Sequence, residues 1–220
     1  MLQNHHYVDP SLALYLKLGS GLFWTLTYIL IIRRGFIDKR YGMPMLALCA
    51  NISWEFIFSF VLPHNPPQLY IDYVWLFFDM FIAAHYLMYG RRSLDNNISP
   101  RLFLPVFIFS LASAFAAILC ITYEFSDWHG VYSAFAQNLL MSALFIQMLW
   151  RRNSADGQSI YIALFKLTGT AIPSVYFYLL FPGAPLLVYL FICISLLDTI
   201  YFILLYQKLK TLGMKPWRRF

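Results

Sequence analysis

Three acidic residues lie deep inside apolar stretches that are long enough to cross a bilayer: Glu55, Asp79 and Asp198. At 1.5 Å per residue, Glu55 lies ~10 Å, Asp79 ~9 Å and Asp198 ~18 Å from one end of its stretch. An ionisable group at such a depth costs ~2.5 to 3.5 kcal/mol, so it usually faces a bundle interior and marks a pathway or a reaction. For any single acid, an interhelical hydrogen bond is the ordinary alternative.

Each of these acids has an aromatic residue three or four positions away, on the same face of an ideal helix. Asn51 is four residues before Glu55 and can fix the rotamer of its carboxyl. A carboxyl in apolar surroundings keeps its proton and can act as a general acid, while aromatic faces can stabilise a carbocation. We therefore predict three catalytic acids, Glu55, Asp79 and Asp198, and five substrate-binding residues, Asn51, Trp54, Phe58, Trp75 and Tyr201.

The composition is that of a membrane protein. Of the 220 residues, 60% are hydrophobic and 12% are charged, whereas soluble domains carry about 25% charged residues. A spanning helix needs ~20 apolar residues, and seven runs approach that length: 12–32, 43–62, 73–89, 102–122, 132–150, 160–180 and 186–206. We predict an all-α bundle of seven transmembrane helices that forms a single domain over residues 1–220.

The basic residues predict the orientation of this bundle. Alternate connections and the C-terminal tail hold Arg33, Arg34, Lys39, Arg40, Arg91, Arg92, Arg101, Arg151, Arg152, Lys208, Lys210, Lys215, Arg218 and Arg219. The other connections have no Lys or Arg, so the positive-inside rule predicts a non-cytosolic N-terminus and a cytosolic C-terminus. This pattern explains the net charge of +6 without nucleic acid as a partner. Two basic residues lie within spans, Lys17 and Lys166, and we expect both to extend to a membrane interface.

Nothing in the sequence predicts a metal or another cofactor. The three cysteines lie in apolar runs without CxxC spacing, and the five histidines are scattered mainly over termini and loops. Seven further acids occupy loops or span ends, where we expect solvent exposure: Asp9, Asp38, Asp72, Asp95, Glu124, Asp127 and Asp156.

The stretches N51-x-x-W54-E55 and D72-x-x-W75-x-x-x-D79, together with Asp198 in the last span and the seven-span layout, resemble the paxilline-type integral-membrane terpene cyclases. The resemblance covers nearly the whole chain. It implies that Glu55 and Asp198 start the cyclisation of a prenyl chain by protonating a terminal epoxide, or an alkene in bacterial relatives. The DDxxD and DxDD motifs of soluble terpene synthases do not occur, in agreement with a metal-free reaction that needs no cofactor.

The resemblance also implies the partners and the location. The substrate would be a lipophilic, prenylated and epoxidised aromatic molecule that enters from the membrane lipid, supplied by a prenyltransferase and an epoxidase of the same pathway. The membrane would be that of the endoplasmic reticulum in a fungus and the plasma membrane in a bacterium.

Two other classes of protein remain open from the residues alone. A small transporter would also place carboxylates within the membrane, although the spans show no matching repeats. A seven-span receptor or retinal protein is the second class. The last span has no lysine for retinal, and the DRY and NPxxY signatures of receptors are missing.

Overall fold

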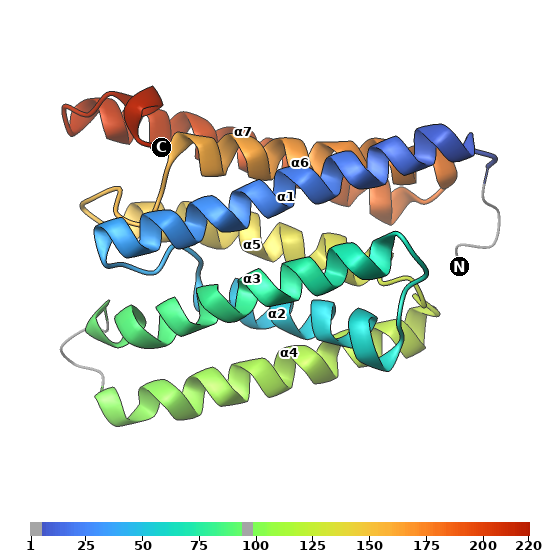
Figure 1. Ribbon diagram of the computed structural model, residues 1–220, viewed down its shortest axis with the longest axis horizontal. Helices are drawn as coiled ribbons and strands as arrows, with labels where there is room; N and C mark the ends of the chain where they lie inside the picture. Colours follow the sequence, from blue (N-terminus) through green and yellow to red (C-terminus); the bar gives the residue numbers. More distant parts are fainter. Residues whose placement is uncertain (1–5, 94–98) are drawn as a thin grey trace.

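The computed structural model describes residues 6–93 and 99–220, and within these ranges the chain is helical and has no strand. Seven long helices run side by side along one axis (Figure 1). Their bounds are α1 (Pro10–Asp38), α2 (Met45–Phe56), α3 (Gln68–Tyr89), α4 (Phe103–Phe125), α5 (Val131–Arg151), α6 (Ile160–Leu180) and α7 (Pro185–Thr211). The shorter elements are the π-helical turn η1 (Ile57–Val61), which continues α2, and the 3₁₀ turns η2 (Gly90–Ser93), η3 (Pro100–Leu102) and η4 (Pro216–Arg218).

Local sequence explains where several helices begin. The Asp9 carboxylate accepts hydrogen bonds from the backbone N–H groups of Ser11 and Leu12, and Pro10 occupies the first turn, where a missing N–H costs nothing. Ser159 caps α6, and α7 begins with Pro185. These signals place the helix starts within a few residues of the predicted apolar runs.

Each of the seven predicted runs corresponds to one of the long helices. Among the described residues, five helices are long and apolar enough to cross a membrane: α1, α3, α4 with its 3₁₀ start, α6 and α7. The second apolar helix, Met45–Val61, is shorter. Helix α5 is more polar because it lies inside the bundle, between α7 and α2, and buries Ser133, Asn138 and Ser142 there.

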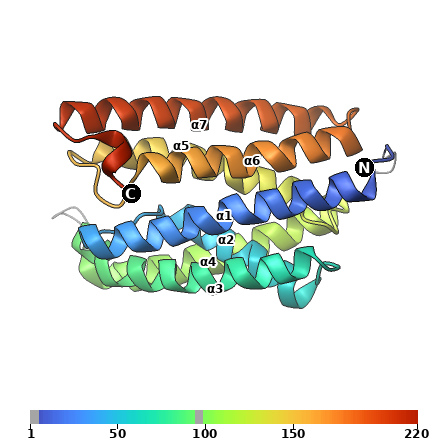
Figure 2. The same ribbon diagram turned by 45° about the horizontal axis from the view of Figure 1, so that its top comes forward.

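Successive helices are antiparallel, so the connections alternate between two ends of the bundle (Figure 1). One end holds the links α1–α2, α3–α4 and α5–α6 and the C-terminal tail. These segments and the adjoining helix ends carry all of the Lys and Arg residues except Lys17 and Lys166. We call this end of the bundle the basic end. The opposite end holds the start of α1 and the connections 62–67, 126–130 and 181–184, which contain no Lys or Arg. Helix α7 lies on one side of the bundle and α3 and α4 on the other (Figures 1 and 2).

The two halves of the bundle are packed differently. In the half near the basic end, all seven helices contribute to one apolar cluster, whose fully buried members include Met43, Leu48, Met141, Ile160 and Leu205. Toward the other end, only smaller clusters form, between α5 and α7 and between α2 and α4. The helices there leave a cavity between them.

Candidate active site

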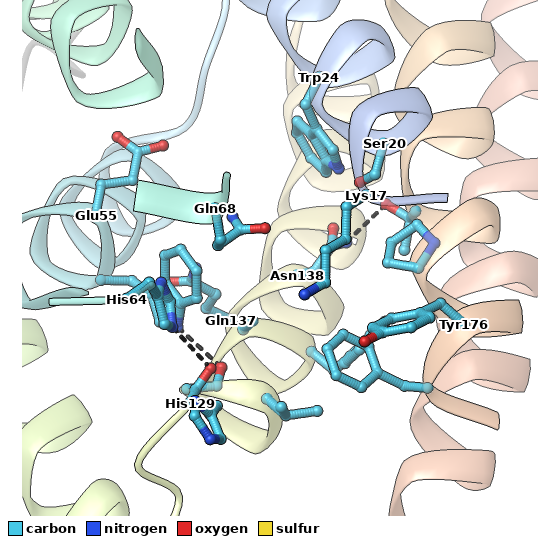
Figure 3. A pocket seen from close by; sticks show the side chains of 18 of the residues that line it. Lys17, Ser20, Trp24, Glu55, His64, Gln68, His129, Gln137, Asn138 and Tyr176 are labelled. Atoms are coloured by element: carbon cyan, nitrogen blue, oxygen red, sulfur yellow. Dashed lines mark hydrogen bonds between the residues drawn. The ribbon is translucent and has the colours of Figure 1, made fainter. Parts of the chain in front are cut away.

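A cavity of about 870 Å³ lies between α1, α2, α5 and α6 in the half away from the basic end. This volume is within the range that small-molecule sites usually have. The connections 62–67 and 126–130 line its outer end, and we call that end the mouth (Figure 3). Rings dominate the walls, and those contributed by the helices are Trp24, Tyr28, Trp54, Trp75, Phe135, Tyr176 and Phe177.

The Glu55 carboxyl lies at the inner part of this cavity and is 1% exposed. Its Oε1 accepts hydrogen bonds from the Tyr28 hydroxyl at 2.9 Å and from Asn51 Nδ2 at 3.2 Å. Asn51 Nδ2 also donates to Asp79 Oδ2 at 2.8 Å. No N–H or O–H group of the described residues donates to Glu55 Oε2 or to Asp79 Oδ1, but the two carboxyls lie within hydrogen-bonding reach of each other, as a pair that shares a proton would. One oxygen of the Glu55 carboxyl is therefore held by Tyr28 and Asn51, and the carboxyl is also paired with that of Asp79.

Aromatic rings surround this carboxyl. The rings of Trp24 and Trp75 approach Tyr28 edge-on, with centroids 5.8 Å and 6.5 Å away. Trp54 Nε1 donates to the Gly130 carbonyl at 2.9 Å, which joins α2 to the α4–α5 connection. Trp75 Nε1 is buried and has no hydrogen-bond partner among the described residues. The inner cavity thus combines aromatic faces with a carboxyl pair and one unpaired donor.

Asp198 belongs to a second polar cluster, and our expectation for Lys166 is wrong. Lys166 does not extend to an interface but is fully buried, with Nζ 2.6 Å and 2.9 Å from the two Asp198 oxygens. Its ammonium also donates to Ser142 Oγ at 2.6 Å and Asn138 Oδ1 at 3.0 Å. The reason is that Asp198 on α7 and two polar side chains of α5 face Lys166, so the charge is paired inside the bundle.

A histidine–aspartate pair lies at the mouth. His64 Nδ1 is 2.7 Å from Asp72 Oδ2, and His64 Nε2 is 3.1 Å from the carbonyl oxygen of His129. The imidazole stacks on Phe58, with centroids 4.8 Å apart. The expectation that Asp72 is solvated is wrong: it is fully buried and also accepts from Gln68 Nε2 at 2.8 Å. Through His64, the connections 62–67 and 126–130 are held against each other.

Comparison with known proteins assigns the family. The family model of Pyr4-like transmembrane terpene cyclases matches residues 3–211, which is most of the chain. The chain belongs to this family. It is an integral membrane protein, as its apolar helices indicate, and the resemblance seen in its sequence motifs is confirmed.

Several curated members of this family are similar to the chain. The Pyr4-family terpene cyclase mfmH of Annulohypoxylon moriforme is 34% identical over 64% of the chain and 59% of its own length. The terpene cyclase pyr4 of Aspergillus fumigatus is 27% identical, over 76% of the chain and 70% of that protein. The terpene cyclase subB of Metarhizium robertsii is 28% identical, over 66% of the chain and 86% of that protein. The match to mfmH thus spans less than two thirds of that relative.

The structure of this family member brings four predicted site residues to the cavity wall: Asn51, Trp54, Glu55 and Trp75. Asp79 lies behind Asn51, and Phe58 lies behind Trp54. Asp198 and Tyr201 do not line the cavity. Tyr201 was predicted to bind substrate, but its ring packs on Phe145 and its hydroxyl donates to Gln158 Oε1 at 3.0 Å. Its side chain fills the tightly packed half because that helix face turns toward α5.

Sequence reasoning missed most of the cavity residues on α1. Lys17, Ser20, Trp24 and Tyr28 line the cavity, and their spacing of three, four and four residues places them on one helix face. This stripe of polar and aromatic residues on one face of an apolar helix is visible in the sequence and could have been used to predict these cavity residues. Lys17, which we expect to extend to a membrane interface, lies partly buried at the cavity wall with its ammonium 5.5 Å from the Tyr176 ring centroid.

The connection 126–130 has its own internal support. Asp127, expected in solvent, is 2% exposed and accepts hydrogen bonds from the N–H groups of Val131 and Ser133 and from the Ser133 hydroxyl. Burial raises the pKa of Asp127, and these hydrogen bonds counteract the shift. Gly130 has φ +60°, and a Cβ there would lie 2.4 Å from Phe58 and 2.6 Å from Trp54 Nε1. Glycine is therefore needed for both the backbone conformation and the close approach of α2.

We predict that Gly130→Ala destabilises the protein more than Gly213→Ala does. Gly213 has φ +69°, but nothing lies within 4 Å of its Cβ position. Both variants therefore incur the ~1 to 2 kcal/mol cost of a left-handed alanine, whereas only Gly130→Ala adds an overpacking cost of ~1 to 3 kcal/mol. Thermal unfolding in detergent measures the difference. Equal losses in the two variants would contradict the close packing of the α4–α5 connection on Trp54 and Phe58.

Proposed function

We propose that the protein cyclises a prenylated aromatic substrate by protonating its terminal epoxide, or a terminal alkene, with Glu55. The observation that carries this proposal is the Glu55 carboxyl, buried at the wall of an aromatic cavity, held at Oε1 by Tyr28 and Asn51 and paired with the Asp79 carboxyl, with which it can share a proton. A general acid must be within reach of the group it protonates, in a site that water does not fill. Membership of a terpene cyclase family supports the same reaction.

The proposed reaction is an isomerisation. Glu55 gives its proton to the epoxide oxygen, the bond from this oxygen to the more substituted carbon breaks, and the oxygen remains as a hydroxyl group. The π electrons of the next double bond form a carbon–carbon bond to that carbon, and the positive charge moves along the chain as rings close. The last cation loses a proton to a base or is captured by a nucleophile on the substrate. Either ending releases one proton, which replaces the proton that Glu55 gave, and all bonding electrons come from the substrate, so the net reaction is an isomerisation that needs no cofactor.

The neighbours of Glu55 support this role. Tyr28 and Asn51 donate hydrogen bonds to Oε1, and such donors stabilise the carboxylate that remains after proton transfer. Asn51 also bonds Asp79, so two carboxyl groups share one amide. Two negative charges on carboxyls that share one amide repel each other, and this repulsion favours a state in which Glu55 or Asp79 keeps a proton. We propose that Asp79 holds Asn51 in place and shares that proton.

We propose that Asp198 supports catalysis from behind the cavity wall. Its partner Lys166 bonds Asn138 Oδ1, and Asn138 lines the cavity. Asn138 Nδ2 in turn donates to Thr170 Oγ1 at 2.8 Å, so this cluster joins α5, α6 and α7 beside the substrate space. The rings of Trp24, Tyr28, Trp54 and Trp75 would fold the polyene, stabilise its cations and exclude water.

We further propose that all seven helices cross the bilayer, with the basic end in the cytosol. The shorter second helix packs against α3, α4 and α5, and the polar α5 packs against α7, α2 and α4, so neither must be apolar on every side. The relatives named above come from fungi, which favours the membrane of the endoplasmic reticulum. A prenyltransferase and an epoxidase would supply the substrate.

We predict that Glu55→Gln abolishes or nearly abolishes cyclisation. Glutamine keeps the size and much of the hydrogen bonding but has no acidic proton, and loss of general acid catalysis costs ~10² to 10⁴ in rate. The measurement is turnover of an epoxyfarnesylated aromatic substrate by purified protein, followed as formation of an isomer of unchanged mass. Glu124→Gln is the matched control, because Glu124 is exposed at the end of α4. Turnover by Glu55→Gln near that of the control would refute the proposed acid.

A second prediction concerns Trp75, which lines the cavity next to Tyr28. Trp75→Ala should change the ratio of products and release partly cyclised alcohols, since the lost ring both uncovers a cation and admits water. Chromatography with mass spectrometry detects the alcohols as products with one added water. Trp150→Ala serves as the control because Trp150 is 70% exposed. An unchanged product profile for Trp75→Ala would reduce Trp75 to a packing residue.

The proposed orientation predicts which single cysteines can be labelled from outside the cytosol. In a background with the three native cysteines replaced by alanine, Asn65→Cys should react with an impermeant maleimide applied to the non-cytosolic side, and Lys215→Cys should not. Both positions are exposed at opposite ends of the bundle. Labelling of Lys215→Cys but not Asn65→Cys would show the reverse orientation.

A further inference from the structure

We propose that Lys17 binds an acidic oxygen on the aromatic head group of the substrate, so that the substrate lies with its head at the mouth and its prenyl terminus at Glu55. This inference rests on the proposed function, because it names the class of substrate for the same cavity. The class is a prenylated aromatic or enolic molecule that carries a carboxylate, phenolate or enolate oxygen.

The first observation is that Lys17 is a cation with no counterion. It is the one Lys or Arg side chain among the described residues that line the cavity, and no described carboxylate pairs with it. The side chain is partly buried, and its ammonium lies 5.5 Å from the Tyr176 ring centroid. The cavity acids cannot neutralise it in place, since Glu55 is held by Tyr28 and Asp127 by the start of α5.

The second observation is the separation between Lys17 and the proposed acid. Tyr28, which bonds Glu55, follows Lys17 by eleven residues on the same helix, and this spacing corresponds to ~16 Å along the helix axis. Both residues line the cavity. The cavity therefore has a cationic end and a carboxyl end, separated by aromatic walls that suit an apolar chain.

The third observation is an unpaired acceptor in the same wall. Gln137 Oε1 is buried and has no hydrogen-bond partner among the described residues. Buried polar atoms are rarely left unpaired, and one that lines a cavity is available to a ligand. An amide oxygen accepts from a hydroxyl group, while the Lys17 ammonium donates to an anionic oxygen. Lys17, Gln137 and Tyr176 come from α1, α5 and α6 and line one space (Figure 3).

This arrangement would set the direction of binding. An anion removed from water needs a paired cation. Lys17 supplies one near the mouth, whereas Lys166, which lies behind Trp24 among the described residues, is already paired with Asp198. A substrate with an acidic head group would therefore be disfavoured in the reversed direction. The correct direction places the epoxide, which is neutral, next to the Glu55 carboxyl.

The test compares two probes that differ in one charge: an epoxyfarnesylated hydroxybenzoic acid and its methyl ester. Wild-type protein in nanodiscs of phosphatidylcholine should bind the acid more tightly than the ester. Lys17→Met should weaken binding of the acid ~10-fold, the size expected for a lost hydrogen bond to a charged group, and leave binding of the ester unchanged. Lys17→Arg should keep the preference. Quenching of tryptophan fluorescence measures binding, because three tryptophans of the helices line the cavity.

Lys210→Met is the matched control. Lys210 also lies over a tyrosine ring, 4.9 Å from the centroid of Tyr206, but it is exposed near the end of α7 and does not line the cavity. Its variant should bind both probes as the wild-type protein does. In turnover assays, Lys17→Met should raise KM for the acid and leave kcat within about twofold, since the anchor is remote from the reacting group.

Binding and turnover separate the two proposals. If the wild-type protein binds the acid preferentially and Lys17→Met removes the preference, the role proposed for Lys17 is supported. This conclusion does not depend on whether the protein converts either probe. If Lys17→Met discriminates between the probes as the wild-type protein does, the anchor is refuted, even where Glu55→Gln still abolishes turnover. A third outcome is that Lys17→Met binds both probes as the wild-type protein does but is no longer stabilised against heat by added anionic lipid. That outcome would assign Lys17 to a lipid phosphate and would also refute the anchor.

Discussion

The structure depends on the cost of placing polar groups inside an apolar bundle. In a bilayer, a buried carboxyl or amide must find its partners within the protein. The hydrogen bonds from Tyr28 and Asn51 to one oxygen of Glu55 meet this requirement in part, and the Asp79 carboxyl is the other partner of Glu55 among the described residues. A proton shared by the two carboxyls lowers the cost of burying them, and Glu55 lines the cavity, where a substrate can take that proton.

The same requirement explains how the rest of the interior is arranged. Asp198 is fully paired by Lys166, and the remaining hydrogens of that ammonium reach Ser142 and Asn138. The Lys166 ammonium and the Asp198 carboxylate thus satisfy each other, and this second cluster does not offer a substrate an unpaired hydrogen-bonding group. The carboxyls of Glu55 and Asp198, which we proposed as catalytic from the sequence, therefore have different environments. One is suited to giving a proton, and the other is suited to holding three helices and the polar side chain of Asn138 in place.

The division of the bundle into a packed half and a hollow half supports this chemistry. Close packing from all seven helices near the basic end fixes the relative positions of α1, α2, α5 and α6. The cavity in the other half can then keep a defined shape, although the side chains of its walls have no packing partner on the side that faces the cavity. The position of its mouth is set by the contact of His64 with the His129 carbonyl oxygen, which joins the two connections, and by the hydrogen bond from Trp54 to Gly130. A defined shape matters for a cyclase, because the folding of the polyene decides which carbons meet.

The sequence alone determined the class of protein, the seven helices and the family, since composition, run length and short motifs carry those properties. It also determined that Asn51 pairs with Glu55, because residues four apart on a helix must meet. Only the tertiary structure decided that Tyr28 completes this site, that Lys166 pairs with Asp198, and that Tyr201 faces the packed core. The physical reason is that membrane helices are apolar on their lipid-facing and core-facing sides alike, so hydrophobic periodicity does not show which face points inward. The rotation of each helix is set by contacts between helices, and the burial of Asp72 and Asp127 is likewise set by connections that meet across the mouth.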